Sequence, residues 1–162
     1  MSTEEKKRLV DNLTEVHIST RAVLDGIDLD MPVHMDSGWR VRDIIGHLAT
    51  WDQEIVNSLQ AFTAGSEYLT PDLDEEEVDF NERAVLKQST LSSQQILEAF
   101  EKANTAFCSA IQNIPDERFS EDFPYPWGNE RGDISTLVGY MIEHAVEHRD
   151  EIERAVQEIQ ND

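Results

Sequence analysis

The chain has 162 residues, enough for one domain with a substantial hydrophobic core. Its charge is strongly acidic, because 34 Asp and Glu residues against 13 Lys and Arg residues give a net charge of -21. Nucleic-acid binding depends on basic side chains that displace counterions from phosphates. This charge therefore argues against a nucleic-acid partner and against an anionic membrane surface. We expect a single acidic domain over residues 1–162.

The sequence shows no signal for export or membrane insertion. No stretch approaches the roughly 18 apolar residues of a membrane span, and residues 1–7 lack the apolar segment of a secretory signal. Cys108 is the single cysteine, which excludes an intrachain disulfide, and we expect it to fill a small apolar position. These features predict a cytoplasmic location.

Apolar residues recur at helical spacing along the first part of the chain. An amphipathic helix is predicted over residues 3–26, followed by a loop at 28–38. A second helix is predicted over residues 41–64, and Gly65 ends it.

The next segment is acidic and then returns to a helical pattern. Residues 67–82 carry eight acidic side chains and no basic one, which is typical of an exposed connection. A short helix is predicted over about residues 74–88. Ser92 and Gln95 form the pattern of a capping box at the start of a third long helix, and Pro115 lies just past its end.

The last segments complete a helical bundle. A loop rich in proline and aromatic residues, 123–128, precedes a fourth long helix, for which Asp133 is a good N-cap and whose apolar stripe reaches Ile159. Four long amphipathic helices must bury their stripes against one another, so we expect an all-α four-helix bundle. The connection between the second and third long helices is longer than a hairpin needs. It predicts a long crossover that leaves these two helices parallel.

Three histidines lie on apolar faces of the predicted helices. His144 and His148 are four residues apart on the fourth long helix, which makes them neighbours on one face. His47 lies on the stripe of the second, three residues after Ile44 and four before Trp51. Each alone fits a buried histidine with its own hydrogen-bond partner, but three such histidines are equally well explained by a shared metal ion. Three imidazoles leave coordination positions open, as in catalytic sites.

Two other metal motifs fit this sequence poorly. The string from His144 to His148 fits the inverted zinc-protease pattern H-x-x-E-H, but those enzymes are much larger proteins with a third, distant carboxylate ligand. A di-iron bundle needs Glu three residues before its ligand histidines, and Met141 and Ile44 stand at those positions.

Other polar residues near these histidines are weaker candidates. Glu151 shares the face of the histidine pair one turn on, so it is a weak catalytic candidate that could orient an imidazole or accept a proton. An exposed surface carboxylate explains Glu151 more simply, and the same holds for Glu147 and Asp43. We expect His17 at the edge of the core, and His34 lies in a loop without an indicated role.

With these residues the chain resembles the DinB-like (YfiT-like) superfamily over nearly its whole length. The resemblance rests on four stretches in order: GWRVRDIIGHLATW (38–51), DFNER (79–83), LSSQQIL (91–97) and HAVEHRDEI (144–152). It implies an up-down-down-up bundle and a divalent ion, often nickel or zinc, held by one histidine of the second helix and the H-x-x-x-H pair of the fourth. Those ligands correspond to His47, His144 and His148.

The resemblance also implies a function, since characterised relatives include bacillithiol transferases and mycothiol-dependent maleylpyruvate isomerase. We expect a metal-dependent transferase that joins a low-molecular-weight thiol to a small electrophile in detoxification, with the sulfur held as thiolate. The alternatives are a hydrolase that uses metal-bound water and a non-catalytic ligand-binding or stress protein. Arg40, Arg42 and Arg149 are candidates for binding a thiol's carboxylates. The oligomeric state is open, although a bundle with a spare apolar face often forms a homodimer.

Overall fold

The fold was determined as a computed structural model that describes residues 2–34, 36–71, 73 and 79–161. Four long helices dominate it: α1 (Ser2–Leu24), α2 (Val41–Thr63), α4 (Ser93–Gln112) and α5 (Ile134–Asn161). The shorter elements are α3 (Phe80–Lys87), the 3₁₀ turns η1 (Gln88–Thr90) and η2 (Asp116–Arg118), and the strands β1 (Phe123–Pro124) and β2 (Arg131–Gly132). The two strands pair antiparallel as a hairpin just before α5.

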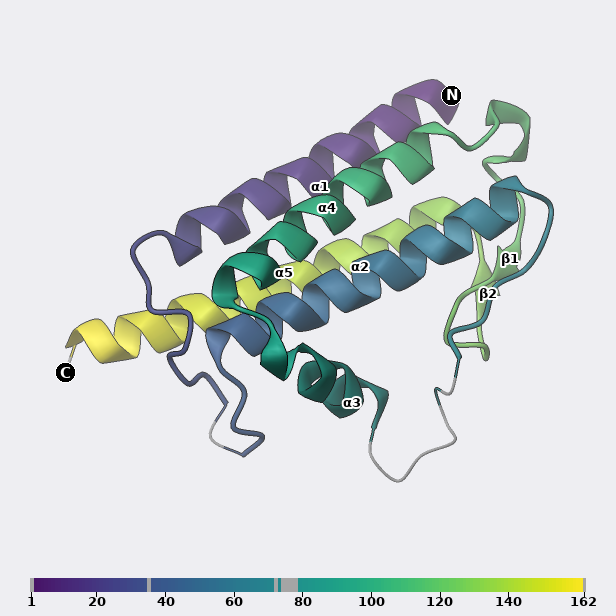
Figure 1. Cartoon of the computed structure of the whole chain (residues 1–162). Coiled ribbons are helices and arrows are strands. Elements are labelled where there is room, and N and C mark those ends of the chain that lie inside the picture. Colours follow the sequence, from purple (N-terminus) through teal and green to yellow (C-terminus); the bar gives the residue numbers. More distant parts are fainter. Residues whose placement is uncertain (1, 35, 72, 74–78, 162) are drawn as a thin grey trace.

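The long helices form a bundle in which α1 and α5 run one way and α2 and α4 run the other (Figure 1). α2 packs most extensively against α4, and α1 packs against α5. The segment that contains α3 carries the chain back along the bundle, so α2 and α4 are parallel (Figure 1). The predicted all-α, up-down-down-up bundle with a long crossover is confirmed. None of the described helices has the length and apolarity needed to cross a bilayer.

Local sequence signals explain most helix boundaries. Gly65 follows α2 with a φ of 83°, in the left-handed region that favours glycine, so the predicted stop signal is where the structure needs it. Ser92 and Gln95 form the predicted capping box, since each side chain accepts a hydrogen bond from the other's backbone N–H, at 3.1 and 2.8 Å. The side chain of Asp133 accepts from the backbone N–H of Thr136 and caps α5 as expected.

The start of the crossover helix differs from the expectation in part. α3 begins at Phe80, where the Asp79 side chain accepts a hydrogen bond from the backbone N–H of Asn81 at 2.7 Å. The predicted start near residue 74 lies outside the described residues. The crossover then docks on α2 through Gln88, whose amide donates to the Gly46 carbonyl at 3.2 Å and to the Thr50 hydroxyl at 3.0 Å.

The core consists of two buried clusters along the bundle. One includes Phe107 and Leu137, and the other includes Ile44. On α5, Met141 belongs to the first cluster and Ile152 to the second, so the two histidines of this helix lie where the clusters meet. The predicted stripe of α5 is wrong at its end, because Ile159 is 54% exposed in the part of the helix beyond the core.

The capping box of α4 gives a stability test. Replacing Ser92 with Ala removes a side-chain acceptor from the first turn, so we expect Ser92→Ala to lower the free energy of unfolding by about 1 kcal/mol. Urea denaturation followed by circular dichroism measures this loss. Ser93→Ala, one residue later and inside the helix, is the control and should leave the midpoint unchanged. Equal stability of the wild type and Ser92→Ala would contradict the assignment of the cap.

Candidate metal centre

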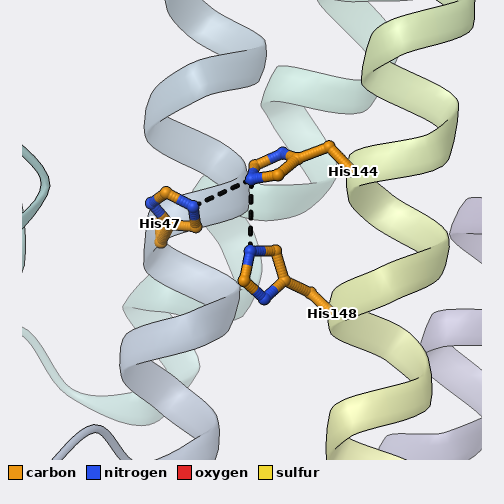
Figure 2. A group of neighbouring side chains, drawn as sticks. All are labelled: His47, His144 and His148. Atoms are coloured by element: carbon orange, nitrogen blue, oxygen red, sulfur yellow. Dashed lines mark hydrogen bonds between the residues drawn. The ribbon is translucent and has the colours of Figure 1, made fainter. Parts of the chain in front are cut away.

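Three imidazoles from two helices meet between α2 and α5. His47 comes from α2, and His144 and His148 come from successive turns of α5 (Figure 2). The Nε2 atom of His144 lies 3.0 Å from Nε2 of His47 and 3.1 Å from Nε2 of His148. One nitrogen from each of the three rings lies within 4.8 Å of the others. The structure therefore brings together all three histidines that the helical spacing singled out.

This arrangement fits a divalent transition-metal ion. Zinc–imidazole bonds are about 2.0–2.1 Å long, so two nitrogens on one tetrahedral ion lie roughly 3.3 Å apart. The two nitrogen–nitrogen distances of 3.0 and 3.1 Å are close to that value. Three neutral imidazoles suit zinc and nickel, as well as copper and iron. The donor set thus fits the kind of ion that the sequence predicts without selecting one metal.

The environment keeps two of the imidazoles in the form that binds metals. Burial, and then repulsion from the neighbouring histidines, lowers the pKa of His47 to about 3. Burial and the proximity of His148 lower the pKa of His144 to about 4, although Glu151 opposes part of this shift. Both rings are therefore neutral near pH 7, and a neutral imidazole offers a lone pair to a cation without first losing a proton.

Glu151 holds the third ring, that of His148, through a hydrogen bond to its Nδ1 atom. One carboxylate oxygen of Glu151 accepts a hydrogen bond from Nδ1 of His148 at 2.6 Å. With the proton on Nδ1, the Nε2 lone pair of His148 faces the other two histidines. Burial raises the pKa of Glu151, but the hydrogen bonds to His34 and His148 outweigh burial, and the net pKa is below its usual value. Glu151 is thus an ionised acceptor rather than an exposed surface carboxylate.

His34 belongs to this centre, although sequence analysis gave it no role. Its Nε2 lies 2.5 Å from the second carboxylate oxygen of Glu151, and its Nδ1 lies 3.1 Å from the Ser37 hydroxyl. The ring stacks on Trp39, which packs in turn against His47. The sequence does contain an indication of this loop geometry. Ser37 and the glycine after it form a turn just before the helix of His47, and this turn brings the loop back to that helix.

A cavity of about 360 Å³ adjoins the three histidines. Its lining residues come from α2, α3, the hairpin loop and α5: His47, Trp51, Asn81, Trp127, Tyr140, Met141 and His144. The indole N–H of Trp127 and the hydroxyl of Tyr140 both donate to the Glu130 carboxylate, at 3.1 and 2.8 Å. The wall is mainly aromatic, and two of the three histidines form part of it. Asn81 and Tyr140 were not singled out by the sequence analysis.

The three candidate arginines lie outside this cavity lining. Arg40 pairs with Asp43 at 3.0 Å within the first turn of α2, which also accounts for Asp43. Arg42 donates to the Leu91 carbonyl. Arg149 pairs with its neighbour Asp150 at 3.0 Å. None of the three side chains belongs to the described lining of the cavity, and their role in binding a thiol's carboxylates stays a prediction.

The remaining polar candidates lie away from the three histidines. His17 pairs with Glu101 at 2.9 Å and packs against Phe100, at the edge of the core as expected. Glu147 is exposed, which agrees with setting the H-x-x-E-H protease motif aside. Cys108 is half-buried, and burial raises the pKa of its thiol, so it stays protonated near pH 7.

Sequence comparison decides the family. Residues 10–153 match the mycothiol maleylpyruvate isomerase N-terminal domain. The chain belongs to this family. The resemblance to the DinB-like superfamily is thereby confirmed. No curated protein sequence gives a match to this member of the family.

Proteins of known structure share the fold of this chain. YfiT from Bacillus subtilis, described as a probable metal-dependent hydrolase with an unusual four-helix bundle topology, superposes with a TM-score of 0.76 at 20% identity, covering 99% of this chain and 90% of YfiT. The mycothiol-dependent maleylpyruvate isomerase superposes with a TM-score of 0.73 at 13% identity over 91% of this chain. The chain spans 60% of that isomerase's length, and a histidine-to-alanine variant of the isomerase gives the same values.

The lowered histidine pKa values predict how the stability of the metal-free protein depends on pH. Between the usual pKa of 6.5 and the folded-state values of about 3 for His47 and about 4 for His144, the unfolded chain binds more protons than the folded chain. The free energy of unfolding therefore falls as the pH drops below 6.5, by up to ~1.4 kcal/mol per pH unit for each ring. Urea titrations at about pH 7 and about pH 5, with a chelator present, measure this slope.

His47→Gln provides the comparison for this slope. Glutamine cannot titrate in this range, so the variant should lose less stability than the wild type between the two pH values, whatever its absolute stability. An unchanged slope in His47→Gln would contradict the proposed burial of a neutral imidazole at this position.

Proposed function

We propose that this protein is a divalent-metal-dependent enzyme that transfers a low-molecular-weight thiol to a small electrophile. Zinc or nickel would be held by His47, His144 and His148. The observation that carries the proposal is the convergence of three imidazole nitrogens at the wall of a cavity of small-molecule size. Membership of the isomerase-domain family and the mycothiol dependence of the similar isomerase support the choice of a thiol.

The metal would supply one kind of chemistry at this position. When bound, a zinc or nickel ion lowers the pKa of a thiol or a water molecule that it coordinates, so that a nucleophile is available at neutral pH. His47 and His144 form part of the cavity wall, so a small molecule in the cavity lies beside the ring edges that would hold the ion. This proximity would bring the electrophile and the nucleophile together in the same cavity.

The surrounding residues position the ligands. The Glu151 carboxylate holds His148 by its Nδ1 atom, and His34 holds the other carboxylate oxygen. Trp39, at the end of the loop, packs against the His47 ring at a tilt, with ring centroids 5.3 Å apart. Glu151 is best described as a positioning residue, because its two oxygens are directed at imidazole nitrogens and it is absent from the cavity lining.

A metal-dependent hydrolase of small molecules is the second candidate. The favouring observation is the similarity to YfiT over 90% of that protein, which is itself described as a probable metal-dependent hydrolase. The same three ligands and the same cavity would serve this reaction. Its distinguishing property is turnover that needs no added thiol. A cytoplasmic location and a homodimer stay predictions.

Metal binding is the first test of the proposal. We expect the wild type, purified without an affinity tag, to bind about one equivalent of zinc or nickel, and His144→Ala to bind at least ~100-fold more weakly, because two ligands cannot replace three. Calorimetric titration and elemental analysis measure this difference. His17→Ala is the matched control, since it removes a histidine that pairs with Glu101 outside the three-histidine cluster. Equal metal affinity in wild type and His144→Ala would overturn the site.

The positioning role of Glu151 gives a second test. Glu151→Gln keeps the size of the side chain but weakens its hold on Nδ1 of His148, so metal affinity should fall about 10–100-fold. The visible spectrum of the cobalt-substituted protein reports the ligand geometry and should change with it. Glu147→Gln, an exposed neighbour on the same helix, is the control and should match the wild type. A Glu151→Gln variant with wild-type affinity and spectrum would limit Glu151 to a structural role.

Turnover assays separate the candidate reactions. The zinc- or nickel-loaded protein should consume a chromogenic electrophile in the presence of mycothiol, bacillithiol or glutathione, and His144→Ala should lose this activity together with its metal. Turnover that persists without any thiol would instead support the hydrolase. The absence of turnover with every thiol, combined with metal loss on dialysis, would favour a non-catalytic ligand-binding protein.

A further inference from the structure

The cavity beside the three histidines has a distinctive lining. Trp51, Trp127 and Tyr140 supply aromatic rings, with the Trp127 ring centroid 6.4 Å from each of the other two. Met141 adds a polarisable apolar surface. No lysine, arginine or carboxylate is among the described residues that line the cavity. Walls of this kind gain most from burying flat apolar groups.

The charge nearest to this wall is negative. The Glu130 carboxylate accepts hydrogen bonds from the indole N–H of Trp127 and the hydroxyl of Tyr140, two residues that line the cavity. Arg131, on the same hairpin, is paired with Asp122 at 2.7 Å and with Glu67 at 3.3 Å. A ligand carboxylate in the cavity would lose water, meet no cation in the lining, and lie near an existing anion.

One lining residue can direct a polar contact. The indole N–H of Trp51 donates to the side-chain oxygen of Asn81 at 2.7 Å. Because an indole nitrogen is a donor only, this bond fixes the orientation of the amide. The NH₂ group of Asn81 is therefore the part of this side chain that can donate to a ligand, and a carbonyl oxygen is a matching acceptor.

We infer that the cavity binds an uncharged aromatic group bearing a carbonyl and rejects the same group when it carries a carboxylate. This inference rests on the proposed function, because it takes the cavity as the place where the electrophile binds. The aromatic lining would then favour neutral aromatic carbonyl electrophiles, and a carboxylate would be accepted only where it reaches the bound cation. A thiol cofactor that carries carboxylates would have to bind with these groups outside the aromatic lining of the cavity.

A matched pair of probes tests this inference: acetophenone, and 4-acetylbenzoate, which adds one carboxylate. The full-length protein is used without metal, because a bound cation would itself attract the carboxylate. The indole N–H signals of the three tryptophans are followed by ¹H–¹⁵N NMR during titration. The signals of Trp51 and Trp127 should shift, whereas that of Trp39, outside the cavity lining, is the internal control.

The expected result is a preference of about tenfold or more for acetophenone. Trp127→Ala should weaken acetophenone binding by about tenfold. Asn81→Asp, which keeps an acceptor for Trp51 but loses the NH₂ donor, should weaken it several-fold. If Trp127→Ala fails to fold, the probe comparison on the wild type still decides.

Glu130→Gln isolates the role of the negative charge. It should strengthen the binding of 4-acetylbenzoate about threefold and leave acetophenone within about twofold. The control is Glu153→Gln, an exposed carboxylate further along α5 and outside the cavity lining, which should change neither affinity.

Two results would overturn the inference: equal or tighter binding of 4-acetylbenzoate, or no movement of the Trp51 and Trp127 signals with acetophenone. The proposed function fails separately, if the wild type does not bind metal in the calorimetric titration. Selective probe binding without metal binding would leave the cavity assignment standing, and metal binding without selective probe binding would leave the proposed function standing.

Discussion

The close approach of α2 and α5 is the contact on which the rest of the site depends. It places His47 against the histidine pair of α5 in the interior, where an imidazole without a partner costs free energy. The rings meet this requirement through one another and through Glu151, which holds His148. Since the two core clusters meet at this level of the bundle, packing on both sides fixes the spacing of the helices at the histidines.

The loop between α1 and α2 completes the site from outside the bundle. Its backbone is held at several points, for example where Val33 donates to the Trp39 carbonyl at 2.9 Å. These backbone contacts place His34 within hydrogen-bond distance of Glu151 and pack Trp39 against His47. On the opposite side, the crossover and the hairpin contribute Asn81 and Trp127 to the lining of the cavity. The cluster of three histidines between two helices is thus flanked by connections that differ in sequence and structure.

Helical periodicity was sufficient to predict the bundle and to place three histidines on inward faces, because a 3.6-residue repeat fixes which side chains share a face. It could not predict His34 or Asn81, whose positions depend on the path of a loop and on how the crossover docks. For Arg40, the spacing in the sequence places Asp43 one turn away, but only the structure shows that the two side chains pair at 3.0 Å.

The docking of Gln88 at Gly46 has a consequence for how this scaffold can diversify. A Cβ atom at position 46 would displace the end of the Gln88 side chain, so glycine leaves room for the Gln88 amide to reach the Gly46 carbonyl. The segment that brings Asn81 to the cavity is therefore attached beside the three histidines, and none of its described residues belongs to the cluster of His47, His144 and His148. Exchanging the crossover between relatives would change part of the cavity lining while the two helices that carry the histidines stay the same, so this segment is suited to altering ligand preference on one bundle.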